Sequence, residues 1–197
     1  TEILVHLIAF SKEKELIDRI VYALQRVKGA YSILFMNESK MVAARDPNGF
    51  RPLILGDLNG FPVVVSETCA LDLIEAKYVR EVGPGELVEI ANDDGKIVSH
   101  FPFPRTDHTP CIFEHVYFSR PDSLTYGKNV YLTRVKFGEQ LAREHPMEAD
   151  VVVPVPDSGI PGAIGYASQS GIPFQYGLIR NHYVSRTFIE PEQGIRA

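Results

Sequence analysis

Residues 149–179 run ADVVVPVPDSGIPGAIGYASQSGIPFQYGLI, and this stretch decides the fold class of the C-terminal half of the chain. The continuous apolar run 149–155 is typical of a strand that is buried on both faces in a parallel sheet. A helix is expected over 160–170, and a second strand over 173–179. Strand, helix and strand in this order form a βαβ unit, which predicts an α/β fold.

The N-terminal half has a different pattern, in which one helix is followed by short strands. Residues 15–28 carry apolar side chains at helical spacing, and Gly29 stands where a helix C-cap is expected. Strands are expected over six β-branched or aromatic runs that are separated by turn residues, namely 30–36, 41–44, 51–55, 62–65, 86–90 and 96–100. Hairpins at this spacing predict an antiparallel sheet with helices packed against it, which is an α+β fold.

A proline-rich segment divides the two patterns. Residues 101–110 contain three prolines and have no apolar periodicity, which is typical of a linker. We therefore expect two domains, 1–103 and 104–197, with their boundary near Pro104. Two further helices are expected, over 68–76 and 130–145.

Composition excludes several classes of protein. The 197 residues are 45% apolar and 23% charged, as in globular proteins, and the net charge of −5 gives no electrostatic basis for binding nucleic acid or an anionic membrane. No apolar stretch approaches the roughly 20 residues that span a bilayer, and no signal-peptide pattern opens the chain. Cys69 and Cys111 are too few for a disulfide framework, so a cytoplasmic setting is expected.

The loop between the strand 149–155 and the helix 160–170 is the first candidate site. Its backbone N–H groups and the helix N-terminus form a ready anion site. Asp157 and Ser158 add a carboxylate and a hydroxyl that suit Mg²⁺ or a ribose hydroxyl. The alternative is that Gly, Ser and Asp only cap the helix, as in any strand-to-helix turn.

Two other segments also allow a functional or a structural interpretation. Residues 46–52 (DPNGFRP) make a stiff connection, which is most simply a tight turn with Asn48 or Gly49 at positive φ. Residues 181–189 (NHYVSRTFI) mix hydrogen-bond donors with aromatic rings and lack periodicity, which is typical of functional loops and of plain surface loops.

Neither the chain start nor the histidines point firmly to catalysis. Thr1 is either an N-terminal nucleophile or a fragment boundary, and the second interpretation is favoured because one terminal residue carries little signal. The six histidines lack the spacing of zinc ligands, and His115 is expected in a strand with an ordinary hydrogen bond.

Six segments in a fixed order resemble one family, glutamine phosphoribosylpyrophosphate amidotransferase, and the resemblance covers essentially the whole chain. The segments are GAYSILFM (29–36), ARDPNGFRPLILG (44–56), SETCALDLIEAKYVREVGPGE (66–86), CIFEHVYFSRPDS (111–123), ADVVVPVPDSGIPGAIGYA (149–167) and RNHYVSRTFIEP (180–191). The resemblance implies the second half of an N-terminal-nucleophile glutaminase in 1–103 and the start of a phosphoribosyltransferase in 104–197.

The family resemblance also implies a reaction and its participants. An N-terminal Cys hydrolyses glutamine, and the ammonia attacks C1 of magnesium-bound phosphoribosyl pyrophosphate, which gives 5-phosphoribosylamine and pyrophosphate in the first committed step of purine biosynthesis. Feedback purine nucleotides and a homo-oligomeric full-length protein are implied as well. The composition gives no reason to expect a nucleic-acid or membrane partner.

The resemblance assigns roles to residues of this sequence. Substrate binding is implied for Asp157, Ser158, Gly159, Arg180 and Arg186, with Ser158 as the candidate magnesium ligand. An ammonia passage is implied for Tyr117, Thr187, Phe188 and Ile189. Cys111 matches the first ligand of the [4Fe–4S] cluster that some members hold. Ser185 replaces the usual Gly of the closing loop, which lowers the expected flexibility there.

The catalytic N-terminal Cys and the acidic phosphoribosyl-binding motif of the family have no counterpart in these 197 residues. We therefore expect the chain by itself to be an incomplete piece that catalyses neither half-reaction. The alternative is a non-catalytic truncated chain or phosphate-binding module. A different glutaminase-linked enzyme, such as a hexosamine synthase, is disfavoured because its partner domain would not carry the segments 151–159 and 180–188.

Overall fold

The structure is a computed structural model, and it describes residues 2–183. The chain forms two compact units, which divide between Val130 and Tyr131, and each is described by itself. The mixed fold class expected from the sequence is confirmed. The family-domain boundary near Pro104 is a different division from that of the compact units and stays a prediction.

A four-stranded antiparallel sheet forms the centre of the first unit. Its strands are β1 (Ser32–Met36), β2 (Lys40–Arg45), β6 (Leu87–Ala91) and β7 (Ile97–His100), in the order β1-β2-β6-β7. The four strands predicted here are confirmed with shifts of one or two residues at their ends. β2 pairs with β1 through a tight turn, but it pairs with β6 only after a long excursion of the chain.

That excursion builds a second antiparallel sheet. Its strands are β3 (Ile54–Leu58), β4 (Phe61–Val65) and β5 (Lys77–Glu81), in the order β4-β3-β5. The sequence did not predict β5, because its KYVRE sequence lacks apolar alternation and its first three residues are exposed. The helix expected over 68–76 is shorter, and α3 (Cys69–Leu73) ends before Glu75, whose φ is 57°.

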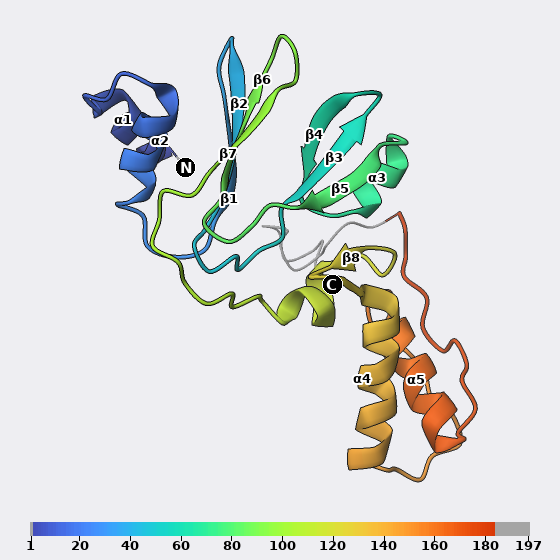
Figure 1. The fold of residues 1–197 in the computed structure, drawn as a ribbon. Coiled ribbons are helices and arrows are strands. Elements are labelled where there is room, and N and C mark those ends of the chain that lie inside the picture. Colours follow the sequence, from blue (N-terminus) through green and yellow to red (C-terminus); the bar gives the residue numbers. More distant parts are fainter. Residues whose placement is uncertain (1, 184–197) are drawn as a thin grey trace. The chain divides into compact units, whose positions relative to one another are not determined.

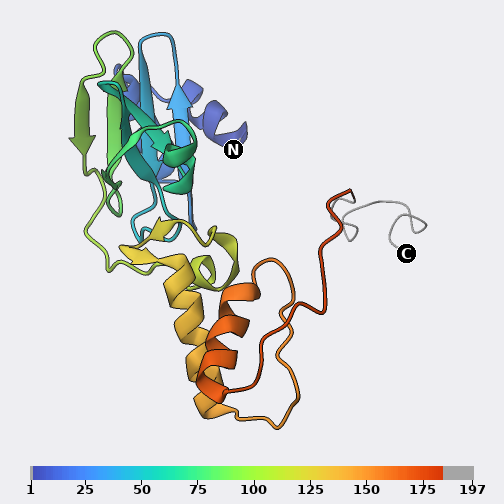
Figure 2. The same cartoon turned by 90° about the vertical axis from the view of Figure 1, so that its right-hand side faces the viewer.

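The first unit is layered, as Figures 1 and 2 show. The helices α1 (Glu2–Phe10) and α2 (Leu16–Leu24) cover one face of the four-stranded sheet, where Val42 and Ala44 of β2 are buried against them. Ala43, between those two residues, points to the other face and packs with Leu55 of β3, because side chains alternate along a strand.

A short irregular region follows residue 104 and closes the first unit. It contains a π-helical turn, η1 (Glu114–Phe118), and a small hairpin of β8 (Leu124–Thr125) and β9 (Lys128–Asn129). The strand expected around His115 is therefore wrong. The Ser119 N–H donates to the Glu114 carbonyl at 3.1 Å, which is the i→i+5 bond of a π turn.

In its described part, which ends at residue 183, the second unit has two helices, α4 (Val130–Glu144) and α5 (Ile160–Ser170), both close to their predicted bounds. The strands expected over 149–155 and 173–179 are wrong as full strands, because the two segments share one parallel bridge, between Val152 and Phe174. The predicted parallel orientation of these two segments is confirmed by that bridge. Most of these residues are exposed, so the described chain supplies no sheet that would extend the bridge.

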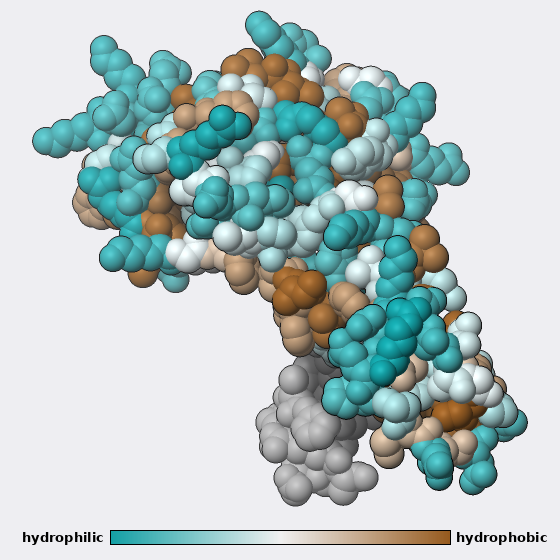
Figure 3. Space-filling view, turned by 60° about the horizontal axis from the view of Figure 1, so that its bottom comes forward, coloured by the Kyte–Doolittle hydropathy of each residue, from teal (hydrophilic) through white to brown (hydrophobic). Residues whose placement is uncertain are grey.

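The described helices and surface give two further facts. Every helix in residues 2–183 is too short or too polar to traverse a lipid bilayer. Figure 3 shows apolar side chains that interrupt the polar surface on one face of the molecule. Among the large hydrophobic side chains that are exposed in the described residues are those of Ile112 and Tyr117.

Candidate functional site

The loop that leads into α5 is the centre of the predicted anion site. Residues 156–159 form a turn in which the Gly159 N–H donates to the Val155 carbonyl at 3.1 Å. The Ile160 N–H donates to the Asp157 carbonyl at 3.3 Å, so the loop is tied to the helix start. A Cβ on Gly159 would lie 2.6 Å from the Val155 oxygen, and therefore this turn requires glycine.

The side chains of this loop face solvent. Ser158 is partly exposed, and within residues 2–183 its hydroxyl has no hydrogen-bond partner. The Asp157 carboxylate accepts a hydrogen bond from Arg180 at 3.2 Å, and both side chains are more than half exposed. The structure thus brings Asp157 and Arg180 together, although an exposed pair of this kind contributes little to stability.

Close packing of two helices fixes the direction of α5. A Cβ on Gly138 would lie 1.8 Å from the Gly162 carbonyl oxygen, and one on Gly165 would lie 2.0 Å from the Val135 oxygen. Only glycine allows the backbones of α4 and α5 to approach this closely. The loop therefore projects from a helix that is held firmly by its neighbour.

Cys111 and Tyr117 lie on the irregular region that follows residue 104. Cys111 is partly buried, and its N–H donates to the Phe50 carbonyl at 3.0 Å. Tyr117 lies on η1 and is half-exposed, next to the rings of Phe113 and Phe118. In the part of the chain that the structure describes, no three metal-binding side chains come together.

The remaining predicted site residues, Arg186, Thr187, Phe188 and Ile189, lie outside the described residues, as does Ser185.

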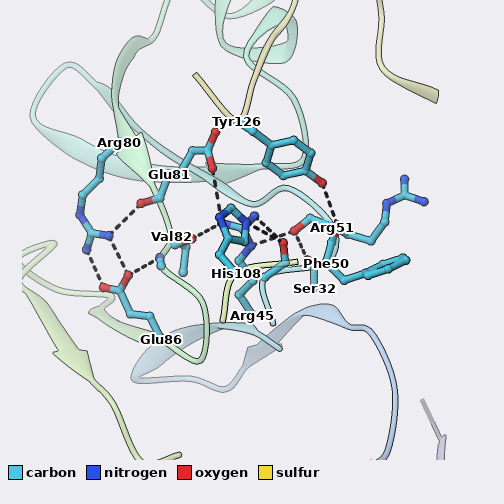
Figure 4. A network of polar contacts seen from close by, with 12 residues as sticks. Ser32, Arg45, Phe50, Arg51, Arg80, Glu81, Val82, Glu86, His108 and Tyr126 are labelled. Carbon is cyan, nitrogen blue, oxygen red and sulfur yellow. Dashed lines mark hydrogen bonds and ion pairs between the residues drawn. The ribbon is translucent and has the colours of Figure 1, made fainter. Parts of the chain in front are cut away.

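Sequence reasoning missed a buried polar network behind the 46–52 turn, which Figure 4 shows. Arg45 is 1% exposed, and its guanidinium donates to three carbonyl groups, those of Gly49, Arg51 and Val82. The neighbouring Asp46 carboxylate accepts the Phe50 N–H at 3.1 Å. Gly49 has a φ of 59°, which confirms the predicted tight turn.

A second part of the network holds the chain at Gly83. Glu86 is buried, and its carboxylate accepts two hydrogen bonds from Arg80 at 2.7 and 2.8 Å and one from the Gly83 N–H at 2.6 Å. Burial raises the pKa of Glu86, but hydrogen bonds from Arg80, Ser99 and Gly83 outweigh it and leave that pKa below its usual value. The carboxylate is therefore charged at neutral pH and structural in role.

A pocket of about 500 Å³ lies next to this network. Its walls are residues 83–85 and parts of 101–108, with the rings of Phe101 and Phe103 and the side chains of Arg105 and His108. Of the predicted site residues that lie within 2–183, none lines it.

Comparison with known proteins finds relatives of one kind over the whole length of this chain. No family model matches the chain. It is 54% identical over 200 aligned residues to an amidophosphoribosyltransferase of Rhizobium etli, and 55% identical over 197 residues to amidophosphoribosyltransferase 1 (chloroplastic) of Arabidopsis thaliana. Both alignments include all of this chain.

The chain is homologous to one part of the amidophosphoribosyltransferases. A solved structure of glutamine phosphoribosylpyrophosphate amidotransferase from Bacillus subtilis, described as complexed with ADP and GMP, is similar to it with a TM-score of 0.90 and 48% identity. That similarity covers 100% of this chain and 43% of the other. The chain spans 40% of the length of the Rhizobium amidophosphoribosyltransferase and 34% of the Arabidopsis one.

Proposed function

We propose that the protein carrying these residues is an amidophosphoribosyltransferase that makes 5-phosphoribosylamine for purine biosynthesis. Glutamine is hydrolysed to glutamate and ammonia, and the ammonia nitrogen displaces pyrophosphate from C1 of phosphoribosyl pyrophosphate. The observation that carries this proposal is the 54% identity over the whole chain to a relative of that name. The 197 residues supply parts of two domains, which we propose meet near residue 104.

In this proposal the loop 156–159 binds the pyrophosphate end of the substrate. Within the described residues the N–H groups of Asp157 and Ser158 make no backbone hydrogen bond, so they and the N-terminus of α5 can attract an anion, while Gly159 permits the close turn. The Asp157 carboxylate alone would repel pyrophosphate, and Arg180 at 3.2 Å offsets that charge. Arg186 is proposed as a further cation for the same substrate.

Magnesium fits the oxygen donors of this loop. The Asp157 carboxylate and the Ser158 hydroxyl are both accessible, and Mg²⁺ prefers such hard oxygen ligands while it keeps several waters. When bound, the metal supplies positive charge to the departing pyrophosphate. Asp157 would then contact both Arg180 and the metal. The Ser158 hydroxyl can turn toward the metal as a second ligand.

We propose Tyr117, with Thr187, Phe188 and Ile189, as part of the wall of the ammonia passage. Tyr117 already lies against the aromatic rings of Phe113 and Phe118, with centroid distances of 5.9 and 6.0 Å. An apolar wall excludes water, which would otherwise protonate and dilute the ammonia.

Cys111 is proposed as one ligand of a [4Fe–4S] cluster in the longer protein. A cluster of this type needs four thiolates, and residues 2–183 bring no such set together, so the other ligands must come from outside this part of the chain. Protein carrying the whole sequence and purified without oxygen should contain iron and sulfide and be brown. A colourless, iron-free protein from cells with intact cluster assembly would make Cys111 a packed thiol only.

Regulation and assembly follow the same proposal. Because the similar Bacillus structure is described as complexed with ADP and GMP, we propose feedback binding of purine nucleotides to the longer protein. A homo-oligomer and a cytoplasmic location are also proposed. Fractionation would test the location, since several plant relatives carry the name chloroplastic.

The experiment is to supply the longer protein with phosphoribosyl pyrophosphate, Mg²⁺ and either glutamine or ammonium, and to measure pyrophosphate release. Gly159→Ala should abolish release with both nitrogen donors, because its Cβ would lie 2.6 Å from the Val155 carbonyl oxygen. Gly162→Ala is the matched control, because its Cβ would meet only the Arg134 oxygen at 3.8 Å. A folded protein that releases no pyrophosphate with either donor would refute the proposal.

A further inference from the structure

Residues 104–129, which we call the strap, are bound along the surface of the first unit. The strap follows the 46–52 turn, where the Thr109 N–H donates to the Asn48 carbonyl at 2.9 Å. The Phe50 carbonyl accepts from the Cys111 N–H at 3.0 Å and from the Tyr126 hydroxyl at 2.7 Å. The end of the segment that composition marked as a linker is also hydrogen-bonded to this turn, through Thr106 to Pro47 and His108 to Gly49.

A second line of contacts joins the strap to the residues just before α3. One oxygen of the Glu67 carboxylate accepts the Arg120 backbone N–H at 2.7 Å and the Ser123 hydroxyl at 2.9 Å. Thr68 beside it accepts the Leu124 N–H on its hydroxyl at 2.8 Å. Ser123 and Thr68 are buried, so water cannot easily replace these partners.

The same strap carries Glu114, which is buried and ion-paired with Arg51 of the turn. The Arg51 guanidinium also lies 4.6 Å from the centroid of the Phe118 ring. The strap is thus held along one side by the 46–52 turn, Arg51 included, and along the other by Glu67 and Thr68. Cys111 and Tyr117 lie on the part of the strap between the 46–52 turn and the Glu67 contact.

We propose that Glu67 is a positioning residue that fixes the strap, and with it Tyr117, against the first unit. Glu67 suits this role because one carboxylate oxygen accepts hydrogen bonds from two points of the strap, the Arg120 N–H and the hydroxyl of the buried Ser123. If Tyr117 lines the ammonia passage, then loosening the strap opens that wall to water. The effect on the ammonia passage rests on the function proposed above, whereas the attachment of the strap by Glu67 does not.

Hydrogen exchange tests the hold directly in the 197-residue chain. In Glu67→Ala the amides of residues 120–124 should exchange about tenfold faster, because the Arg120 N–H loses its charged acceptor. Glu67→Gln retains one acceptor oxygen and should restore most of the protection. Ser66→Ala, at the exposed neighbouring position, is the control and should leave exchange unchanged. Unchanged exchange in Glu67→Ala would overturn the proposal.

Activity of the longer protein tests the consequence for the reaction. Glu67→Ala should lower glutamine-dependent pyrophosphate release about tenfold more than ammonium-dependent release, because only the former uses the passage. Glu67→Gln should recover most of this ratio. Equal loss with both nitrogen donors would overturn the role of Glu67 in ammonia transfer. If the unmutated protein releases no pyrophosphate, the proposed function fails, and the exchange result alone decides whether Glu67 holds the strap.

Discussion

Replacing Gly165 with alanine should destabilise the second unit, although alanine is the better helix former. In the middle of a helix this substitution normally gains about 0.5–1 kcal/mol. Here the new Cβ would lie 2.0 Å from the Val135 carbonyl oxygen, so α4 and α5 would have to separate by more than an ångström. Overpacking of this kind costs about 1–3 kcal/mol or more, and a rigid backbone places this site at the upper end, so we expect a net loss of about 2 kcal/mol.

Gly162→Ala is the matched control on the same helix. Its Cβ would lie 3.8 Å from the Arg134 oxygen, which is ordinary contact, so its stability should be unchanged or higher by up to about 1 kcal/mol. The chain has no tryptophan, so urea unfolding is best followed by circular dichroism, with hydrogen exchange of α5 to assign the change to this unit. Equal stability of the two variants would refute the close approach of α4 and α5.

Two further predictions concern the first unit. Glu86→Gln should lower the free energy of unfolding by about 1.5–3 kcal/mol near pH 7, because the carboxylate loses its charged bonds to Arg80. Folding lowers the pKa of Glu86, so this difference in unfolding free energy should be largest above the usual pKa of 4.5. It should disappear as the pH falls through the lowered pKa of the folded state. If urea titrations gave a difference that does not depend on pH, the role of the Glu86 charge would be contradicted. Gly49→Ala should lower the free energy of unfolding by about 1–3 kcal/mol in thermal melts, since φ is 59° and the Cβ would lie 2.9 Å from Pro84. Gly60→Ala is the control, because Gly60 also has a positive φ but its Cβ would meet nothing within 4 Å, and its loss should be clearly smaller.

Local pattern was sufficient where neighbours in sequence determine the structure. The bounds of α5 and the turn at Gly49 follow from spacing and turn residues, and the hairpin of β6 and β7 from its Asp-Gly turn. The loop that leads into α5 was also predicted from its Pro, Ser and Gly residues before the helix, and its role as an anion site stays a prediction.

Long-range contacts explain most of what the sequence did not predict. The aromatic, β-branched run around His115 is typical of a strand, yet the ion pair of Glu114 with Arg51 accompanies a π-helical turn there. Burial of Arg45 depends on two carbonyl groups of the 46–52 turn and on that of Val82, 37 residues away in sequence, which no local pattern shows. The apolar run 149–155 is typical of a strand that is buried on both faces of a sheet. The run itself does not show which segments supply the neighbouring strands.

The order of the strands has a consequence for the kinetics of folding. β1 and β2 form a local hairpin, but the β2–β6 ladder joins Ala44 to Leu87 and must close a loop that contains the whole second sheet. Closing a long loop costs conformational entropy before the new contacts can stabilise it, so ladders between distant strands form late in folding. The β3–β4 hairpin inside the loop is local and can form early, and it draws the ends of β2 and β6 together. Substitutions in that hairpin should therefore slow folding, whereas those at the β2–β6 ladder should mainly speed unfolding.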